Sequence, residues 1–311
     1  MFKVFGKREI VDNKMPLALT MGNFDGVHVG HKLMLAEFVE FSKPLPTCVL
    51  TFFPHPTRLF LPDAPKPMIL SIQSRVEHLL ACGIDTVVVQ NFSEEFAELT
   101  ADEFVRRYLA DHFHIERAMI GYDFSYGKDR LGDFAHLSRH ASNEGWLVKH
   151  GTPYRMSGQI VSSSLIRESL VKGRVDEAEQ LLGYPYALEG EVVHGDKRGR
   201  VIGFPTANID VQNEILPAFG VYACEVMRNS KGTLHQAVMN CGYRPTLGQD
   251  LRLQVEAHLL DFDDDLYGEK LSFRLRKFIR KEMRFSGFNE LKEQISRDVT
   301  AARIFFAAPQ T

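Results

Sequence analysis

The sequence has few cysteines, no long apolar run and almost no net charge. Its 311 residues include four cysteines, and no two of them form a C-x-x-C pair, so neither a disulfide scaffold nor a zinc ribbon is expected. No apolar run approaches the roughly 18 residues that a membrane-spanning helix needs. The opening segment MFKVFGKREIVDNK has no apolar h-region, so no secretory signal is expected. These absences predict a protein of the reducing cytoplasm without a membrane partner.

The charge of the chain is nearly balanced. The 37 Lys and Arg residues against 40 Asp and Glu residues give a formal net charge of −3. A protein that coats nucleic acid needs a basic stripe, so nucleic acid is not an expected partner, although a small basic pocket for a nucleotide remains compatible. The length of 311 residues predicts two domains, at roughly 100–200 residues per domain.

The first half of the chain alternates short apolar strands with amphipathic helices. Strands are expected at residues 17–21, 47–52, 86–89 and 118–120, and helices at about 30–41 and after the capping box Thr100–Glu103. This alternation predicts a Rossmann-like α/β domain, in which a parallel sheet carries helices on both faces. Ligands bind at the carboxyl ends of such strands, so the candidate loops are 22–31, 53–58 and 121–130.

The pattern changes in the segment LLGYPYALEG, which carries Gly183, Pro185 and Gly190. It predicts a boundary between a domain of residues 1–183 and one of residues 184–311. Strands are then expected at 220–227, 236–240, 251–259 and 271–275, and the last two alternate with period two around a turn, which predicts a hairpin. Apolar residues three or four apart between Leu291 and Phe306 predict a helix. The second domain is therefore expected to be a mostly antiparallel β-barrel with a C-terminal helix.

The strongest chemical signal is the segment GNFDGVHVGH at residues 22–31. His28 and His31 are three residues apart, with Gly30 between them, where a helix is expected to begin, so their side chains share one helix face. A helix N-terminus favours anions, and two imidazoles there could stabilise charge on a phosphate in a transition state. The missing Cβ of Gly30 would let a nucleotide approach the backbone. The string alone fits a turn with two solvent-facing histidines equally well, and its place after a strand favours the functional interpretation.

This segment resembles the signature of the HxGH nucleotidyltransferases, and its longer form resembles the adenylyltransferase half of the bifunctional bacterial riboflavin kinase/FAD synthetases. TFFPHP (51–56), GYDFSYG (121–127) and VSSSLIRESL (161–170) are similar to that family in the same order. The resemblance implies that His28 and His31 are catalytic. It also implies nucleotide-binding residues, namely Gly22, Asn23, Phe24, Asp25, Gly30, Asp123, Ser162, Ser163, Ser164 and Arg167. The three serines alone would also fit a common helix N-cap cluster, and Ser125 and Leu165 stand where the family often has arginine.

The second half resembles the kinase module of the same family. GRVIGFPTAN (199–208), NCGYRPTL (240–247) and VEAHLLDFDDDLYG (255–268) follow in the order of the family. The resemblance implies that Thr206 and Asn208 help to hold Mg²⁺ and the ATP phosphates, and that Glu256 is the base acting on the riboflavin 5′-hydroxyl. It also places Gly199, Pro205 and Arg280 in the nucleotide and flavin sites. Thr and Asn supply the hard oxygen ligands that Mg²⁺ prefers. Without the resemblance, PTAN would be interpreted as a turn and Glu256 as a surface charge.

The resemblance covers nearly the whole chain and implies a bifunctional enzyme. The second domain would transfer the γ-phosphate of ATP to riboflavin to give FMN, and the first would adenylylate FMN with a second ATP to give FAD and pyrophosphate. ATP, riboflavin and FMN are then the substrates, Mg²⁺ accompanies ATP, and the flavins are not prosthetic groups. The oligomeric state stays open. So do three alternatives: another HxGH nucleotidyltransferase acting on a phosphopantetheine or nicotinate substrate, a chain with one working site, and a non-catalytic flavin-binding protein.

Overall fold

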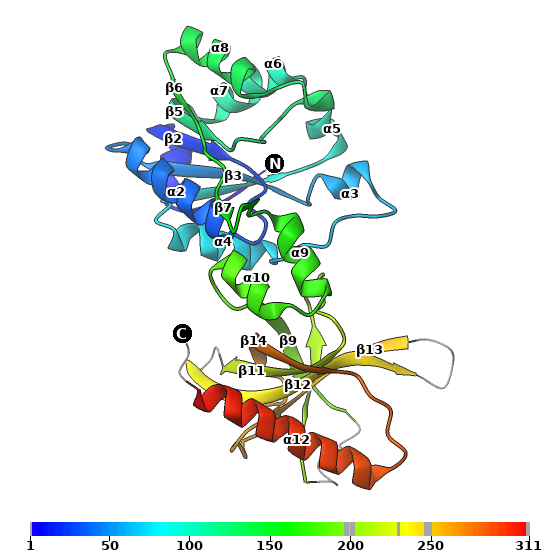
Figure 1. The fold of residues 1–311 in the computed structure, drawn as a ribbon. Helices are drawn as coiled ribbons and strands as arrows, with labels where there is room; N and C mark the ends of the chain where they lie inside the picture. Colours follow the sequence, from blue (N-terminus) through cyan, green and yellow to red (C-terminus); the bar gives the residue numbers. More distant parts are fainter. Residues whose placement is uncertain (1, 196–198, 200–202, 229–230, 246–250, 309–311) are drawn as a thin grey trace. The chain divides into compact units, whose positions relative to one another are not determined.

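The computed structural model describes residues 2–195, 199, 203–228, 231–245 and 251–308. The chain forms two compact units, Met1–Ser163 and Ser164–Thr311 (Figure 1). The expected boundary at residue 183 lies further along the chain than this division. Two helices make the difference, α9 (Ser163–Val171) and α10 (Val175–Leu182).

These two helices pack against the barrel of the second unit. The carbonyl oxygen of Leu170 accepts a hydrogen bond from the N–H of Ala218 at 3.0 Å, and Arg276 forms an ion pair with Glu179 at 3.4 Å. Gly183 adopts a left-handed φ of 72° and caps the C-terminus of α10. The glycine that suggested a domain boundary therefore ends a helix.

The first unit contains a six-stranded sheet in the order β1-β4-β3-β2-β5-β6. The strands are β1 Phe2–Gly6, β2 Pro16–Met21, β3 Thr47–Phe53, β4 Thr86–Asn91, β5 His114–Ile120 and β6 Leu147–His150. All neighbours are parallel except β1, which pairs antiparallel with β4 at the edge of the sheet. The expected Rossmann-like α/β domain is confirmed. Its two edge strands, the antiparallel β1 and the parallel β6, were not among the expected strands. The remaining two strands, β7 Arg155–Met156 and β8 Gln159–Ile160, pair only with each other.

Helices cover both faces of the sheet. On one face α2 (Val29–Ser42) and α4 (Ile72–Ala81) pack against a core that includes Ala18 and Val49. The other face carries α6 (Ala101–Glu103), the π-helical segment Phe104–Leu109, α7 (Ala110–His112) and α8 (Phe134–Glu144). Shorter helical turns are α1 Glu9–Asp12, α3 Thr57–Phe60, α5 Glu94–Ala97 and the 3-10 turn Lys128–Arg130. The expected capping box of Thr100 and Glu103 is present.

The second unit contains a closed antiparallel barrel in the order β10-β13-β12-β11-β14-β9. The strands are β9 Ala187–Val193, β10 Ala207–Val211, β11 Gly220–Arg228, β12 Thr233–Pro245, β13 Leu251–Leu259 and β14 Lys270–Lys281. The expected barrel is confirmed. The expected hairpin between the last two strands is wrong, because β13 pairs with β10 and β12 whereas β14 pairs with β9 and β11. Period-two alternation shows that a strand has one buried face, but it does not show which strand is the neighbour.

The expected terminal helix is α12, Phe288–Ala307. Its residue Ala302 is fully buried in a small core with Val221, Ala223 and Val238 of the barrel. Val299 and Phe306, two of the apolar residues that predict the helix, pack against the same core. The helix therefore covers the outer face of the strands that carry these three residues.

Candidate functional site

Two buried charged side chains hold the loop that follows β2. Arg75 of α4 is fully buried, and its Nη1 donates to the carbonyl oxygen of Asn23 at 2.9 Å. Asp25 is 2% exposed and accepts hydrogen bonds from the backbone N–H groups of Ile69 at 3.1 Å and Leu70 at 3.3 Å. The loop is thus fixed at two points, by the guanidinium of Arg75 and by the backbone hydrogen bonds to its own carboxylate, Asp25. The sequence prediction did not include Arg75, because no local motif surrounds it.

The backbone of the same loop turns sharply before the helix. Phe24 has a φ of 48° and Gly26 a φ of 83°, in the left-handed region that favours glycine. A Cβ on Gly22 would lie 3.1 Å from the ring of Phe24. Gly22, which directly follows β2, therefore leaves room for the Phe24 ring, and the turn leads the chain to the start of α2.

His28 and His31 stack on each other at the start of α2. Their ring centroids are 3.6 Å apart and the ring planes differ by 16°. His28 is the N-cap residue, and its Nδ1 accepts the backbone N–H of His31 at 3.3 Å, so a neutral His28 carries its proton on Nε2. A Cβ on Gly30 would lie 3.2 Å from the His28 ring. The glycine between the histidines therefore makes room for the stacked imidazole.

Both imidazoles are neutral in this environment. Burial lowers the pKa of His28 to about 4. Burial, together with the charges of His28 and Arg75, lowers the pKa of His31 well below its ordinary value. The Nδ1 atom of His31 is buried and has no hydrogen-bond partner among the described residues. The start of α2 thus combines a helix N-terminus with two fixed imidazoles, an arrangement that suits the phosphate oxygens of a nucleotide.

The other expected nucleotide-binding residues divide between the two units. In the first unit Asp123 is exposed after β5, Ser162 is half-buried, and Ser163 donates from Oγ to the carbonyl oxygen of Asp25 at 2.8 Å. Ser164 is exposed and Arg167 is half-buried, and both belong to the second unit as part of α9. The structure therefore joins Ser163 to the loop that precedes the stacked histidines.

In the barrel, the expected base and an expected metal ligand are direct neighbours. Glu256 of β13 is opposite Asn208 of β10 and opposite Asn240 of β12. Side chains directly opposite in an antiparallel ladder lie on the same face, with Cβ atoms roughly 5 Å apart. The Oε1 atom of Glu256 also accepts a hydrogen bond from Nε2 of Gln254 at 2.6 Å. The carboxylate thus lies between two amide side chains, on the face opposite the buried Val255.

The segment before β10 folds back on Gly199. The N–H of Phe204 donates to the carbonyl oxygen of Gly199 at 2.8 Å, and a Cβ on Gly199 would lie 3.2 Å from Oγ1 of Thr206. The carbonyl oxygen of Pro205 lies 2.8 Å from Nδ1 of His258 on β13. These contacts place Thr206 next to the strand pair that carries Asn208. The GRVIGFPTAN and NCGYRPTL motifs extend in part, at 200–202 and 246–247, outside the described residues.

Arg280 is engaged in an ion pair with the C-terminal helix. Its Nε donates to Oδ1 of Asp298 at 2.9 Å and its Nη2 donates to Oδ2 at 2.7 Å. Asp298 is 3% exposed, and Nη1 of Arg280 donates to the carbonyl oxygen of Lys281 at 2.9 Å. The guanidinium therefore ties the end of β14 to α12.

Comparison with known proteins matches both halves of the chain. Residues 11–165 match the family model described as FAD synthetase, and residues 182–306 match the one described as Riboflavin kinase. Two curated relatives carry the name Bifunctional riboflavin kinase/FMN adenylyltransferase. The one from Escherichia coli (strain K12) is 40% identical over 93% of this chain and 92% of its own length, and the one from Bacillus subtilis (strain 168) is 35% identical over 96% and 95%.

A solved structure also matches most of the chain. It is titled Crystal Structure of Macrolide-efflux Protein from Streptococcus pneumoniae, and it superposes with a TM-score of 0.84 at 29% sequence identity. The match covers 93% of this chain and 94% of that one. Among the described residues of this chain, no helix is both long enough and apolar enough to cross a bilayer.

Proposed function

The chain belongs to the bifunctional riboflavin kinase/FMN adenylyltransferase family, and from this premise we propose which residues perform each reaction. It phosphorylates riboflavin with ATP to FMN, and it adenylylates FMN with ATP to FAD and pyrophosphate. We assign adenylyl transfer to residues 1–183 and the kinase reaction to residues 184–311. The assignment is supported by the two family models, which match up to residue 165 and from residue 182.

For adenylyl transfer, the observation that carries the assignment is the stacked pair of neutral imidazoles beside a buried guanidinium. An oxygen of the FMN phosphate attacks the α-phosphorus of ATP in line, and the bond to the β-phosphate breaks as pyrophosphate leaves. His28 and His31 stabilise the charge that builds on the α-phosphate, since N–H donors fixed in advance act most strongly where charge develops. Further binding residues are proposed from the sequence, namely Gly22, Asn23, Phe24, Asp25, Gly30, Asp123, Ser162, Ser163, Ser164 and Arg167.

For the kinase reaction, the supporting observation is the pairing of Glu256 with Asn208. The carboxylate takes the proton of the riboflavin 5′-hydroxyl, whose oxygen then attacks the γ-phosphorus of ATP as ADP leaves. Thr206 and Asn208 offer oxygen donors of the kind that Mg²⁺ prefers, and they lie next to the strand pair of the base. They would hold Mg²⁺, which neutralises phosphate charge when bound. Gly199 and Pro205 are proposed to border the nucleotide, and Arg280 the flavin.

The location in the cell and the metal follow as part of the same proposal. Both reactions consume ATP, which supports a cytoplasmic enzyme acting on small molecules. The triphosphate charge supports a divalent cation as its companion, and Mg²⁺ commonly binds through one or two protein ligands plus phosphate oxygens.

Chromatography of flavins tests both assignments in one experiment. The chain is incubated with riboflavin, ATP and Mg²⁺. We expect the double variant His28→Ala/His31→Ala to accumulate FMN without FAD. We expect Glu256→Ala to leave riboflavin unchanged but to convert supplied FMN to FAD. Riboflavin phosphorylation by Glu256→Ala at the wild-type rate would refute the role of that carboxylate, and FAD formation by the double variant would refute the role of the histidines.

A further inference from the structure

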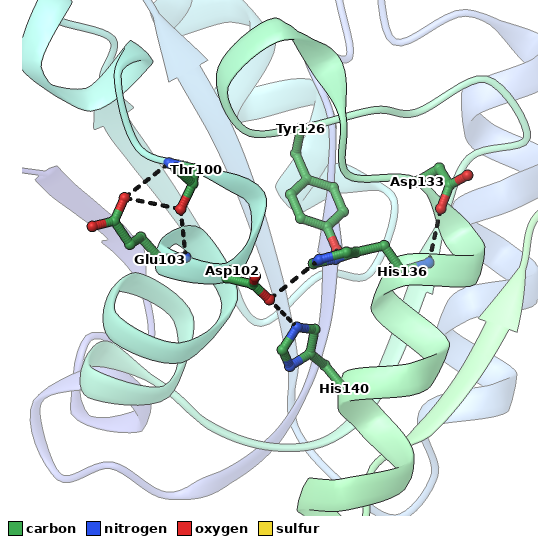
Figure 2. Close-up of polar contacts among 7 residues, drawn as sticks. All are labelled: Thr100, Asp102, Glu103, Tyr126, Asp133, His136 and His140. Atoms are coloured by element: carbon green, nitrogen blue, oxygen red, sulfur yellow. Dashed lines mark hydrogen bonds and ion pairs between the residues drawn. The ribbon is translucent and has the colours of Figure 1, made fainter.

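Three ligand-type side chains converge in the first unit, away from the loop after β2. His136 and His140 lie one turn apart on α8, and Asp102 lies on α6. Nε2 of His140 is 2.6 Å and Nε2 of His136 is 3.4 Å from the same oxygen, Oδ1 of Asp102. Figure 2 marks both contacts as dashed lines. One possible ligand atom from each residue lies within 4.8 Å of the other two. Two helices that are separate in the chain thus bring an acid between two imidazoles.

The neighbours of these side chains hold them in place. The hydroxyl of Tyr126 is 2.8 Å from Nδ1 of His136. This contact orients the imidazole of His136 so that its Nε2 atom faces Asp102 (Figure 2). When the hydroxyl oxygen accepts the Nδ1 proton, Nε2 presents its lone pair, as in metal-binding histidines whose other nitrogen is hydrogen-bonded. The side chain of Asp133 caps α8 by accepting the backbone N–H of His136 at 2.8 Å, and the Thr100–Glu103 capping box fixes the turn that carries Asp102.

We propose that Asp102, His136 and His140 bind a divalent transition-metal ion of the Zn²⁺ type. Two imidazole nitrogens and one carboxylate oxygen form a donor set of three-ligand zinc sites, whose fourth position takes water or another ligand. In a tetrahedral site with bonds of about 2.0–2.1 Å, neighbouring ligand atoms are about 3.3 Å apart. The His136–Asp102 distance of 3.4 Å already meets this requirement.

The His140–Asp102 distance of 2.6 Å is a hydrogen bond that the ion would replace. The side chain of Asp102 is 65% exposed, whereas those of His136 and His140 are 15% and 10% exposed. The carboxylate is therefore the group that has room to move back. The two imidazoles stay fixed by packing, so the site needs one rotation of an exposed side chain to accept the ion.

The open side of the cluster is a cavity of about 340 Å³ that also has Arg106, Arg139 and Asn143 in its wall. The two guanidinium groups would favour a negatively charged fourth ligand on the metal. They also raise the alternative of a site for an anion alone. The carboxylate of Asp102 argues against that alternative, because it lies between the imidazoles, where an anion would meet a like charge.

The proposed ion is separate from the site of adenylyl transfer. The cluster belongs to the helices on the face of the sheet that Phe104 and Leu137 cover, whereas the helix of His28 and His31 covers the opposite face. An ion held by Asp102 and two residues of α8 would cross-link α6 to α8. It would therefore stabilise the first unit without entering either reaction.

The experiment is a Zn²⁺ titration of the full chain, stripped with EDTA and dialysed, without nucleotide or flavin. Calorimetry should show one strong site per chain, and binding should raise the melting temperature of the first unit because the ion binds the folded state. Co²⁺ in place of Zn²⁺ should give the visible absorption of a tetrahedral ion. The proposal is overturned if the wild-type protein shows neither a strong Zn²⁺ site by calorimetry nor the absorption of tetrahedral Co²⁺.

Variants of the cluster separate this site from chance binding. Asp102→Asn, His136→Gln and His140→Gln should each weaken Zn²⁺ binding by more than about 100-fold, and Tyr126→Phe by about 10–100-fold, the usual effect of removing a group that orients a ligand. His114→Gln removes an exposed histidine of the same unit and should leave the affinity unchanged. Equal Zn²⁺ binding by wild type and the three ligand variants would refute the site.

Arg106→Gln distinguishes a metal from an anion. Removing a positive charge from the cavity should tighten Zn²⁺ binding, and it should weaken inorganic phosphate if the cavity is an anion site. Phosphate binding to the metal-free wild type that is lost in Arg106→Gln, together with unchanged or weaker Zn²⁺ binding in that variant, would overturn the metal assignment. Circular dichroism of each metal-free variant checks that it is folded.

Discussion

Asn208 and Glu256 are direct partners across the β10–β13 ladder, so that an amide and a carboxylate share one face of the barrel. The two side chains are proposed to have different tasks, Mg²⁺ binding for Asn208 and proton removal for Glu256. Because side chains alternate along a strand, a slip of one residue in β10 would send Asn208 to the opposite face. The register of the barrel therefore sets the geometry proposed for the kinase reaction.

The first prediction concerns this pair. Asn208→Ala should lower the kcat/KM of riboflavin phosphorylation by about 100-fold or more, since it removes a proposed ligand of the Mg²⁺ that would neutralise phosphate charge. FAD formation from supplied FMN should not change, as the adenylyl site is built elsewhere. Asp210→Asn is the matched control, because this exposed residue lies two positions further on the same strand and face. Equal losses in the two variants would show that β10 is merely disturbed.

The second prediction concerns the glycine between the histidines. Gly30→Ala places a methyl group 3.2 Å from the His28 ring, so the ring must shift by a few tenths of an ångström. Adenylyl transfer should fall roughly 10-fold, because small misplacements of catalytic groups are costly. Thermal stability should stay equal or rise, since Ala is favoured over Gly within a helix by about 1 kcal/mol. FMN adenylylation at the wild-type rate would contradict the requirement for close stacking.

The third prediction is a pH dependence of stability. The folded-state pKa of His28 is lowered to about 4 by burial, whereas the unfolded chain has the ordinary value near 6.5. Between these two values the unfolded state binds more protons, so the stability that is present above pH 6.5 is lost as the pH falls toward 4. Each pKa unit corresponds to about 1.4 kcal/mol, so the full loss of stability from His28 is roughly 3 kcal/mol.

The variant His28→Asn should remove this part of the pH dependence. Asparagine keeps an N-cap acceptor but does not titrate. The single tryptophan of the chain, Trp146, packs against the core of the first unit, so its fluorescence during urea unfolding reports on that unit. Wild type should lose more stability than His28→Asn between pH 7.5 and pH 4.5. Parallel pH profiles for the two proteins would contradict a neutral, buried His28.

The fourth prediction concerns the ion pair of Arg280. Asp298→Ala should destabilise the barrel unit by about 3–5 kcal/mol, because it leaves a guanidinium at the end of β14 without its carboxylate. The double variant Arg280→Met/Asp298→Leu should recover most of that stability, which calorimetry can measure. The same double variant tests the flavin role proposed for Arg280. An unchanged KM for riboflavin in the stable double variant would assign Arg280 to structure alone.

Much of the fold could be predicted from local patterns. The strand of Val87–Val89 is buried on both faces and therefore reads as a continuous apolar run, and the apolar spacing in α12 indicates a helix directly. The edge strand β1 was not predicted, because its residues are only partly buried and its segment FKVFG is too short to show a period. Strand neighbours in the barrel could not be predicted either, since pairing depends on residues far apart in the sequence.

The candidate site likewise combines residues of one sequence motif with residues that only folding brings together. His28 and His31 lie in one continuous motif, so their joint position was predictable. Arg75 reaches the loop after β2 from α4, and nothing in its own neighbourhood indicates this. The spacing of four residues between His136 and His140 was a visible signal for a shared helix face. Their acidic partner comes from another helix, and only the folded structure shows it.

The shortest strand of the barrel, β10 with five residues, closes the ring between β9 and β13. If it detached, the two neighbouring strands would each present a row of unpaired backbone groups, and such rows recruit strands from other molecules. Binding of Mg²⁺ and its nucleotide at Asn208 would hold β10 in its place. Bound ATP would thus protect the kinase unit from aggregation, and the enzyme without ATP should aggregate more readily.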